Sequence, residues 1–504
     1  MTSAEDPVPS LRIEEPSALT AAAILRLARG ELSLDLDENL LRGLDTRRAA
    51  LLAALARGGP VYGVNTGMGA LSQHRLDESA QSRHQEALLV ARSAGGPPWL
   101  TAEEVRAVLG VRLRTFLNGD AGVGARLCRR IVEVIDSGIT PAVPRTSTGV
   151  AGEIIGLAHL GAALVGTGEV IGVEGEAVPA GPVLDAGGLA RLRLGPKEGV
   201  ALIEGVPMAT ALAILTSARA RGLLRQELLV LAAEFALTNA ARDVFDARLG
   251  RGDVELTRLT ATLRELAGSA HQPRALQPPV SFRASAQVLA HLLRSLTALD
   301  AAIERAMAGV TDSPAFLPDR AGEGNAFVGS AGFYGYDLAA NLHALTVALI
   351  GVAELGAARL HRLLDPAVSG RTAQLSVDPG PQTGLSPVHK RAVGVTHQLR
   401  RQALPASLGP VETSAGQEDV QAFALEAAEA ARAATIGARE VLACELLAIH
   451  QVRCLGATMP SDAGRELITA LDAVAALLPA DPGDRPFGRD VETLRRLLGA
   501  GWPA

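Results

Sequence analysis

Lysine is nearly absent from this chain of 504 residues: only Lys197 and Lys390 occur, and arginine carries the remaining positive charge. The sequence also lacks a cluster of lysine and arginine of the kind that binds nucleic acid, and its net charge is −6 at pH 7. We therefore expect no nucleic-acid partner.

Cysteine is scarce as well. The three cysteines, Cys128, Cys444 and Cys454, are scattered and show no C-x-x-C spacing. This pattern argues against a disulfide framework and against a structural zinc site. The ten histidines show no H-E-x-x-H spacing either. The sequence therefore predicts no metal site.

A secretion signal is not visible. The first residues, Met1 to Pro7, are acidic and contain proline, whereas a signal begins with basic and then apolar residues. The apolar run 338–355 is interrupted by Asn341, His343 and Glu354, so we expect a buried helix rather than a membrane span. These features favour a soluble cytoplasmic protein with no membrane partner.

Helical periodicity dominates the rest of the sequence. Four long segments are rich in Ala, Leu, Glu and Arg and almost free of internal Gly and Pro: 207–248, 284–309, 337–364 and 417–455. Several are apolar around most of their circumference, which is typical of helices in the centre of a bundle or at a subunit interface. Residues 140–200, by contrast, are rich in Gly, Val and Pro. The sequence predicts a mainly α fold, with a long-helix bundle core over 201–504 and a smaller mixed N-terminal domain over 1–200.

Five short blocks carry the strongest functional signal. They read Y-G-V-N-T-G-M-G (62–69), T-S-T-G-V-A-G-E-I-I-G-L-A-H (146–159), P-K-E-G-V-A-L (196–202), S-F-R-A-S-A-Q-V (281–288) and T-S-A-G-Q-E-D (413–419). In this order they resemble the motifs of the histidine and aromatic amino acid ammonia-lyases. The resemblance implies a histidine ammonia-lyase-like fold. It also implies a homotetramer whose active sites are shared between subunits.

The second block differs from the family at its most important position. In the family, an Ala-Ser-Gly triad cyclises and dehydrates into a methylidene-imidazolone electrophile. Aligned back from Leu157-Ala158-His159, the triad falls on Val150, Ala151 and Gly152. Alanine replaces the serine whose hydroxyl must be eliminated, so the electrophile cannot form there. The resemblance thus implies a lyase scaffold without that cofactor.

Another triad nearby could cyclise in principle. Ser147-Thr148-Gly149 would need Thr148 to dehydrate in place of serine. This triad lies three residues too early and would give a more crowded alkene. We therefore expect it to stay unmodified.

The resemblance assigns roles to several residues. Tyr62 stands where the family keeps the base that removes the β-proton, and a phenol of pKa about 10 needs nearby cations or donors for this task. Arg283 matches the arginine that grips the substrate carboxylate, for which guanidinium is a planar bidentate donor. Glu418 matches a glutamate near the substrate amine or ring, although a carboxylate at the start of the predicted helix 417–455 could instead serve as a helix cap. The resemblance further implies three substrate-binding residues: Asn65 and Gln417 within the matched blocks, and Gln277, which survives from a degraded pattern just before Ser281.

Other positions depart from the family pattern together. Glu204 stands where an asparagine normally contacts the electrophile. Arg92 stands where a histidine or an apolar residue usually selects the ring of the substrate. Val280 replaces a tyrosine thought to aid elimination, and the block 329–336 has lost its asparagine. The site has been either rebuilt for a different leaving group or released from selection.

Without the electrophile, ammonia is a poor leaving group from a weakly acidic substrate. We therefore predict a carbon–nitrogen lyase that converts a carboxylated ammonium compound into an α,β-unsaturated acid, with Tyr62 as the base. Glu204 and Glu418 would suit a cationic leaving group, because a buried carboxylate needs a partner. The family resemblance extends to ergothioneine-degrading lyases, which act on a trimethylammonium substrate without the electrophile.

Three points stay open at the level of sequence. Arg92 indicates a second anionic group on the substrate, unless it pairs with Glu204. The same fold could catalyse a different elimination, an addition or a cyclisation. The chain could also be a non-catalytic scaffold, although the joint presence of Tyr62, Arg283 and Glu418 favours a catalyst.

Overall fold

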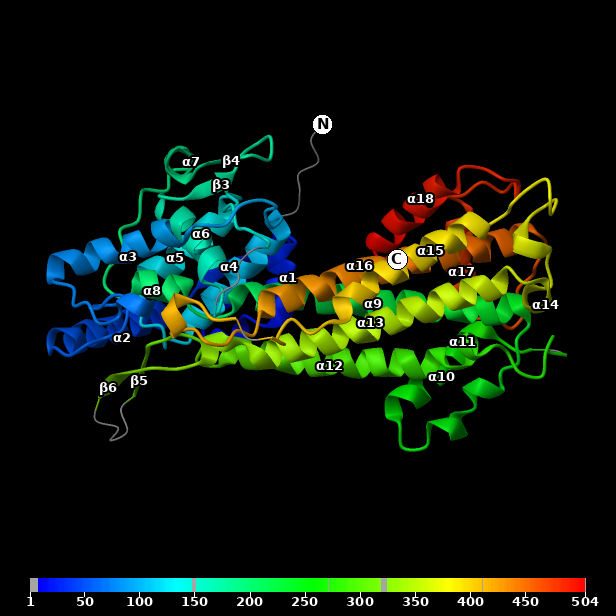
Figure 1. Cartoon of the computed structure of the whole chain (residues 1–504), viewed down its shortest axis with the longest axis horizontal. Coiled ribbons are helices and arrows are strands. Elements are labelled where there is room, and N and C mark those ends of the chain that lie inside the picture. Colours follow the sequence, from blue (N-terminus) through cyan, green and yellow to red (C-terminus); the bar gives the residue numbers. More distant parts are fainter. Residues whose placement is uncertain (1–7, 147–150, 271, 319–323, 410, 504) are drawn as a thin grey trace. The chain divides into compact units, whose positions relative to one another are not determined.

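The structure, a computed structural model, describes residues 8–146, 151–270, 272–318, 324–409 and 411–503 (Figure 1). It confirms the mainly α-helical fold. The chain forms two compact units. Unit 1 comprises Met1–Leu215, Asp300–Leu342 and Pro405–Glu429, and unit 2 comprises Thr216–Leu299, His343–Leu404 and Ala430–Ala504. Each unit is therefore assembled from three separate segments, which a single boundary near residue 200 did not anticipate.

Unit 1 combines short helices with small sheets. Its helices are α1 (Ala21–Ala28), α2 (Glu38–Ala56), α3 (Glu78–Arg92), α4 (Ala102–Leu117), α5 (Ala125–Asp136), α6 (Ile154–Val165), α7 (Ala180–Ala186) and α8 (Glu198–Ile203). Local sequence explains where they begin and end. For example, Thr101 and Glu104 form a capping box at the start of α4, and Gly166 ends α6 with a φ of +85°.

Three two-stranded sheets complete unit 1. In the first, β1 (Ser10–Ile13) pairs in parallel with β2 (Ser33–Leu36). The other two pairs are antiparallel: β3 (Glu169–Ile171) with β4 (Ala177–Pro179), and β5 (Ala315–Pro318) with β6 (Asn325–Val328).

Helices α3, α6 and α8 pack closely against one another in unit 1. Glycine makes this approach possible, because a Cβ at position 199 of α8 would lie 2.3 Å from the backbone oxygen of Gln85 on α3. A Cβ at position 161 of α6 would likewise lie 3.0 Å from Leu89. The packing holds the three helices together, and candidate site residues lie at or beside their ends.

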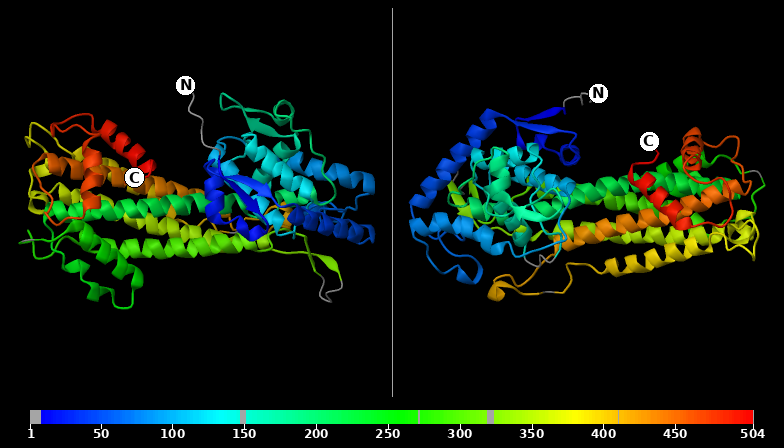
Figure 2. Two further views of the ribbon diagram at one scale, coloured as in Figure 1. Left: turned by 180° about the vertical axis from the view of Figure 1, so that it is seen from behind. Right: turned by 90° about the horizontal axis from the view of Figure 1, so that it is seen from above.

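Unit 2 is dominated by long helices. Four long helices are shared with unit 1: α9 (Pro207–Thr238), α12 (Ser285–Ala308), α13 (Tyr336–Leu363) and α16 (Ala424–Cys454). The helices that lie wholly in unit 2 are α10 (Val254–Ala267), α11 (Val280–Arg283), α14 (Pro366–Ser369), α15 (Ser386–Leu399), α17 (Arg465–Ala475) and α18 (Phe487–Gly499). The unit 2 portions of α9, α12, α13 and α16 run side by side in both views (Figures 1 and 2). The four predicted long helices are confirmed.

A cluster of buried charges lies inside this bundle. The guanidinium of Arg359 pairs with three carboxyl groups, those of Glu227 (3.1 Å), Glu234 (2.7 Å) and Glu445 (2.8 Å). Burial, together with the charge of Glu445, raises the pKa of Glu227 to about 8. One cation thus faces three acids, and burial favours the protonated form of the excess carboxyl groups.

Two helical stretches, Glu198–Thr238 and Gly332–Leu363, are long and apolar enough to cross a membrane by length and composition. The most apolar window of the first is wholly buried within the protein, and 56% of the corresponding window in the second is buried. Burial of this kind is what the core helices of a soluble protein show. The run 338–355 is helical as predicted, but it is buried only in part.

Candidate active site

Tyr62 lies in a loop of unit 1 whose shape is fixed by its own side chains. The amide oxygen of Asn65 accepts a hydrogen bond from the Val61 N–H (2.7 Å), and its amide nitrogen donates to the Gly59 carbonyl (2.8 Å). Gly63 has a φ of +68°, and a Cβ there would lie 2.8 Å from the Met68 side chain. Asn65, predicted to bind substrate, therefore shapes the loop in this structure, and its contact with substrate stays a prediction.

The phenol of Tyr62 is half-buried, and its oxygen accepts a hydrogen bond from the Gly69 N–H at 2.7 Å. Burial raises the pKa of Tyr62, and the carboxyl groups of Glu204 and Glu418 add to the rise. The Gly69 N–H and the positive charge of Arg92 act in the opposite direction. The phenolate is thus disfavoured in the free protein, and a bound cation would favour it.

Two cavities meet at Tyr62. The larger has a volume of about 400 Å³ and is lined by residues that include Arg92 and Leu71. The smaller has a volume of about 250 Å³ and is lined by residues that include Glu204 and Ala151. Four residues line both cavities: Tyr62, Met68, Ile154 and Glu418. The structure therefore brings together most of the predicted site residues of unit 1.

Glu204 follows directly after α8 and is buried, with 7% of its surface exposed. Its side chain lines the smaller cavity. Burial and the nearby Asp312 raise its pKa to about 8, whereas Lys197 and Arg112 partly offset the rise. At neutral pH the carboxyl group therefore holds its proton in the free protein, and a cation in the cavity would promote its ionisation.

Three buried residues behind Glu204 form a polar network that the sequence did not reveal. Lys197 is fully buried and forms an ion pair with Asp312. The guanidinium of Arg112 donates to the carbonyl oxygens of Ala201 (3.3 Å) and Glu204. Both cations are thus bound to other groups, so neither neutralises the Glu204 carboxyl directly. Lys197 could have been noticed from its place in the P-K-E-G block, as one of only two lysines.

Glu418 belongs to a tight loop in unit 1. Its carboxylate accepts a hydrogen bond from the Thr413 hydroxyl (2.6 Å), and its backbone oxygen accepts from the Thr413 N–H (2.9 Å). Because α16 begins only at Ala424, the alternative of Glu418 as a cap of that helix is wrong. Gln417, which is exposed, lines the smaller cavity beside Glu418.

Arg92 is the last residue of α3 and lines the larger cavity. It forms no ion pair within 4.0 Å with a carboxylate of any described residue, so the alternative pairing of Arg92 with Glu204 is absent from this structure. Burial lowers the pKa of Arg92, and the charges of Tyr62, Glu204 and Glu418 oppose this effect. The guanidinium is available to a ligand in the cavity.

The described part of the degenerate triad lies on the wall of the smaller cavity. Ala151 lines it, and Gly152 has a φ of +77°. The following residue, Glu153, is buried and accepts hydrogen bonds from the N–H groups of Met208 and Ala209, both at 2.6 Å, at the start of α9. These hydrogen bonds tie Glu153, the residue after Gly152, to the N-terminus of α9. Val150 and the alternative triad 147–149 lie outside the described residues.

Two predicted residues belong to unit 2. Arg283 is the last residue of α11, is half-buried, and has a buried Nε without a hydrogen-bond partner among the described residues. Gln277 is exposed, as is Val280. Their contact with substrate stays a prediction.

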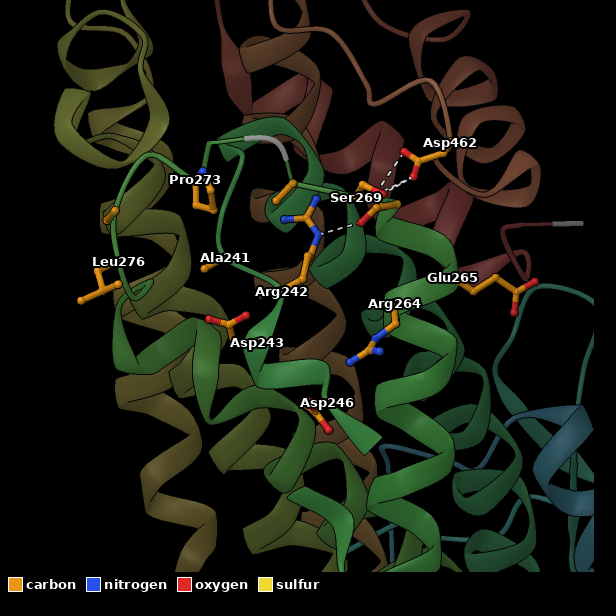
Figure 3. A pocket seen from close by; sticks show the side chains of 13 residues that line it. Ala241, Arg242, Asp243, Asp246, Arg264, Glu265, Ser269, Pro273, Leu276 and Asp462 are labelled. Carbon is orange, nitrogen blue, oxygen red and sulfur yellow. Dashed lines mark hydrogen bonds between the residues drawn. The ribbon is translucent and has the colours of Figure 1, made fainter. Parts of the chain in front are cut away.

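Unit 2 also contains a cavity of about 880 Å³ (Figure 3). Several of its polar groups bind one another or the backbone: Arg242 donates to the carbonyl oxygens of Gly268 (3.0 Å) and Phe235 (2.9 Å), and the Ser269 N–H donates to Asp462 (3.0 Å). Figure 3 shows Ser269 and Asp462 turned toward each other. None of the predicted site residues lines this cavity, so the candidate active site is placed at Tyr62.

Over the described ranges of the chain, no group of three or more His, Cys, Asp or Glu side chains is placed to hold a metal ion.

Comparison with known sequences reveals extensive similarity. A family model described as aromatic amino acid lyase matches residues 19–475. Histidine ammonia-lyase from Geobacillus thermodenitrificans is 32% identical over 462 residues, which cover 90% of each chain. Histidine ammonia-lyase from Aromatoleum aromaticum is 31% identical over 496 residues, covering 96% of this chain and 93% of that one.

Solved structures share the fold over almost the whole chain. Ergothionase from Treponema denticola, an ergothioneine-degrading enzyme, superposes with a TM-score of 0.90 at 23% identity and covers 98% of this chain and 99% of its own. Tyrosine aminomutase from Streptomyces globisporus gives a TM-score of 0.89 at 25% identity, with 96% and 95% covered. Together with the match over residues 19–475, this similarity shows that the chain belongs to the aromatic amino acid lyase family.

Proposed function

We propose that the protein is a carbon–nitrogen lyase that eliminates an amine or ammonium group from a carboxylated substrate without a methylidene-imidazolone cofactor. The observation that carries this proposal is Ala151, which lines the same cavity as Tyr62 and Glu204. An alanine has no hydroxyl group to eliminate, so the residue at this wall does not fit the cofactor of the family. The elimination must therefore be driven by a good leaving group on the substrate and by the charged side chains of the site.

In the proposed reaction, the phenolate of Tyr62 removes a proton from the β-carbon. The electron pair of that C–H bond forms the Cα=Cβ double bond, and the pair of the Cα–N bond leaves with the nitrogen. A quaternary ammonium suits this step, because it cannot lose its charge by deprotonation and departs as a neutral tertiary amine. The products are an α,β-unsaturated acid and the amine, and the proton stays on Tyr62 until solvent removes it.

The charges of the cavity support a cationic substrate group. Glu204 and Glu418 both line the smaller cavity together with Tyr62. A cation between them would supply the partner that a buried carboxylate needs. The same cation would lower the pKa of Tyr62 and so favour the base form. The positive charge of the substrate therefore promotes both its own binding and the formation of the Tyr62 phenolate.

The substrate carboxylate requires a further cation, and we assign it to Arg283, with Gln277 beside it. These residues belong to unit 2, where the neighbouring side chains of Leu276 (91%) and Val280 (64%) are apolar and exposed. We further propose a cytoplasmic homotetramer in which this surface meets another subunit, as the family resemblance implies. Size-exclusion chromatography with light scattering would measure the oligomeric state.

A paired substrate panel tests the proposed function. Histidine, phenylalanine, tyrosine and aspartate are each supplied as the free amino acid and as the N-trimethyl betaine, and unsaturated acids are detected by absorbance and mass spectrometry. We expect turnover of betaines only, and turnover at least about 100-fold slower in Tyr62→Phe. Formation of other products would favour a different elimination, an addition or a cyclisation. Complete inactivity would favour a non-catalytic scaffold.

A further inference from the structure

The larger cavity contains an arginine that the proposed reaction does not yet use. Its charged lining side chains are Arg92 and Glu418, and the Glu418 carboxylate already accepts a hydrogen bond from Thr413. Arg92 is half-buried, and its guanidinium makes no hydrogen bond and no ion pair within 4.0 Å with any described residue. The cavity thus presents a guanidinium whose hydrogen-bonding groups are not satisfied by the protein.

The surroundings of Arg92 make an anionic ligand favourable. Most of the other walls are apolar, and the lining includes Ala70, Leu71, Ala91, Ala94 and Ile155. A cation that has lost part of its hydration without gaining a partner is destabilised, and a carboxylate can restore two parallel hydrogen bonds to guanidinium. Arginine presents this bidentate geometry better than lysine does. The cavity is therefore suited to a carboxylate.

The placement of Tyr62 links this anion site to the reaction. Tyr62 lines both cavities, with Arg92 in the larger one and Glu204 in the smaller one. A substrate that spans both would place its ammonium group near Glu204, its β-carbon at the Tyr62 oxygen, and an anionic side chain near Arg92. We infer that the substrate carries a second carboxylate, attached to its β-carbon, and that Arg92 binds it.

This inference rests on the proposed elimination and explains how it proceeds without the electrophile. When Tyr62 removes the β-proton, the electron pair can delocalise into the attached carboxylate as an enediolate, whose added negative charge Arg92 stabilises. The pair then forms the double bond as the Cα–N bond breaks. The products are an unsaturated dicarboxylate and a neutral tertiary amine, with the proton on Tyr62. No oxidant, reductant or other co-reactant is needed.

Equilibrium binding of two unreactive ligands tests the anion site. Succinate and its monoamide, succinamate, differ in one charge and have nearly the same shape. By calorimetry on the full-length protein, we expect succinate to bind at least about tenfold more tightly, which corresponds to about 1.4 kcal/mol. Arg92→Met should remove the preference, whereas Arg83→Met, on the exposed surface of the same helix α3, should keep it. Circular dichroism and thermal melting verify that both variants are folded.

Turnover of a second matched pair separates this inference from the proposed function. N-trimethylaspartate should be converted to an unsaturated dicarboxylate much faster than N-trimethylasparagine, and Arg92→Met should reduce the difference at least tenfold. Equal binding of succinate and succinamate by the wild-type protein would overturn the inference, even if betaines react. A preference for succinate that depends on Arg92, without any turnover, would support the anion site and contradict the lyase function.

Discussion

Replacement of Glu204 by glutamine should weaken the binding of a cationic substrate, and more so at alkaline pH. The side chain is buried, lines the smaller cavity and has a pKa raised to about 8 by burial and by Asp312. A carboxyl group with a raised pKa is neutral below that value and charged above it. The wild-type protein should therefore bind a cation more tightly as the pH rises through 8, and Glu204→Gln should not.

The size of the effect follows from the charges. A unit cation about 5 Å from the carboxylate gains roughly 3 kcal/mol at an effective dielectric constant of about 20. At pH 7, ionising a carboxyl group whose pKa is raised to about 8 costs roughly 1 kcal/mol. The net loss in Glu204→Gln is then about 2 kcal/mol, or roughly 30-fold in Kd. At pH 9 the ionisation cost disappears, and the loss rises to roughly 100-fold or more.

The assay is calorimetric binding of an N-trimethyl betaine in the Tyr62→Phe background, where the ligand is not consumed. Glu204→Gln is compared at pH 7 and pH 9 with Glu31→Gln, whose carboxylate lies on the exposed surface of unit 1. The control should change Kd less than twofold at either pH. A defect of Glu204→Gln that is equal at both pH values, or smaller at pH 9, would refute the assignment of Glu204 as a partner of the cation.

Four further predictions concern Tyr62, the peptide 145–159 and the buried charges around Arg359. Tyr62→Phe should lower kcat by about 10²–10⁴-fold, as loss of a general base does, with KM little changed; a mild loss in kcat would point to another base. Mass spectrometry of a peptide spanning 145–159 should give the unmodified mass, and a deficit equal to two water molecules would show that a triad had cyclised. Arg359→Met should lower the free energy of unfolding by about 3–5 kcal/mol, because it leaves buried carboxyl groups without their cation. In the wild-type protein, the raised pKa of Glu227 means that the native state binds more protons than the unfolded one. Stability measured in urea should therefore fall as the pH rises from about 4.5 to about 8, and a rise over this range would contradict the geometry of the cluster.

The long helices were predictable because their apolar residues repeat with helical periodicity, whereas several ends were not. The first predicted helix, 207–248, ends as α9 at Thr238, since Asn239 adopts a φ of +49°. The last, 417–455, begins as α16 only at Ala424, after a loop in which Ser414 and Ala415 also have positive φ. Residues other than glycine seldom adopt this conformation, so their identities gave no warning.

Sequence blocks identified the residues that face the cavities but not the groups that support them. Tyr62, Glu204, Glu418 and Arg92 stand in or near recognisable blocks, and unit 1 brings their side chains to the two cavities that share Tyr62. The ion pair between Lys197 and Asp312 joins positions 115 residues apart. Such a contact leaves no local pattern in the sequence.

The most direct test of a cofactor-free elimination is the identity of the amine released by the purified protein. Each free amino acid is compared with its N-trimethyl betaine, and ammonia and trimethylamine are quantified together with the unsaturated acid. We expect trimethylamine from betaines, in equal amount to the unsaturated acid, and release at least about 100-fold slower from Tyr62→Phe. Release of ammonia from a free amino acid, at a rate similar to that of the betaine, would contradict this expectation.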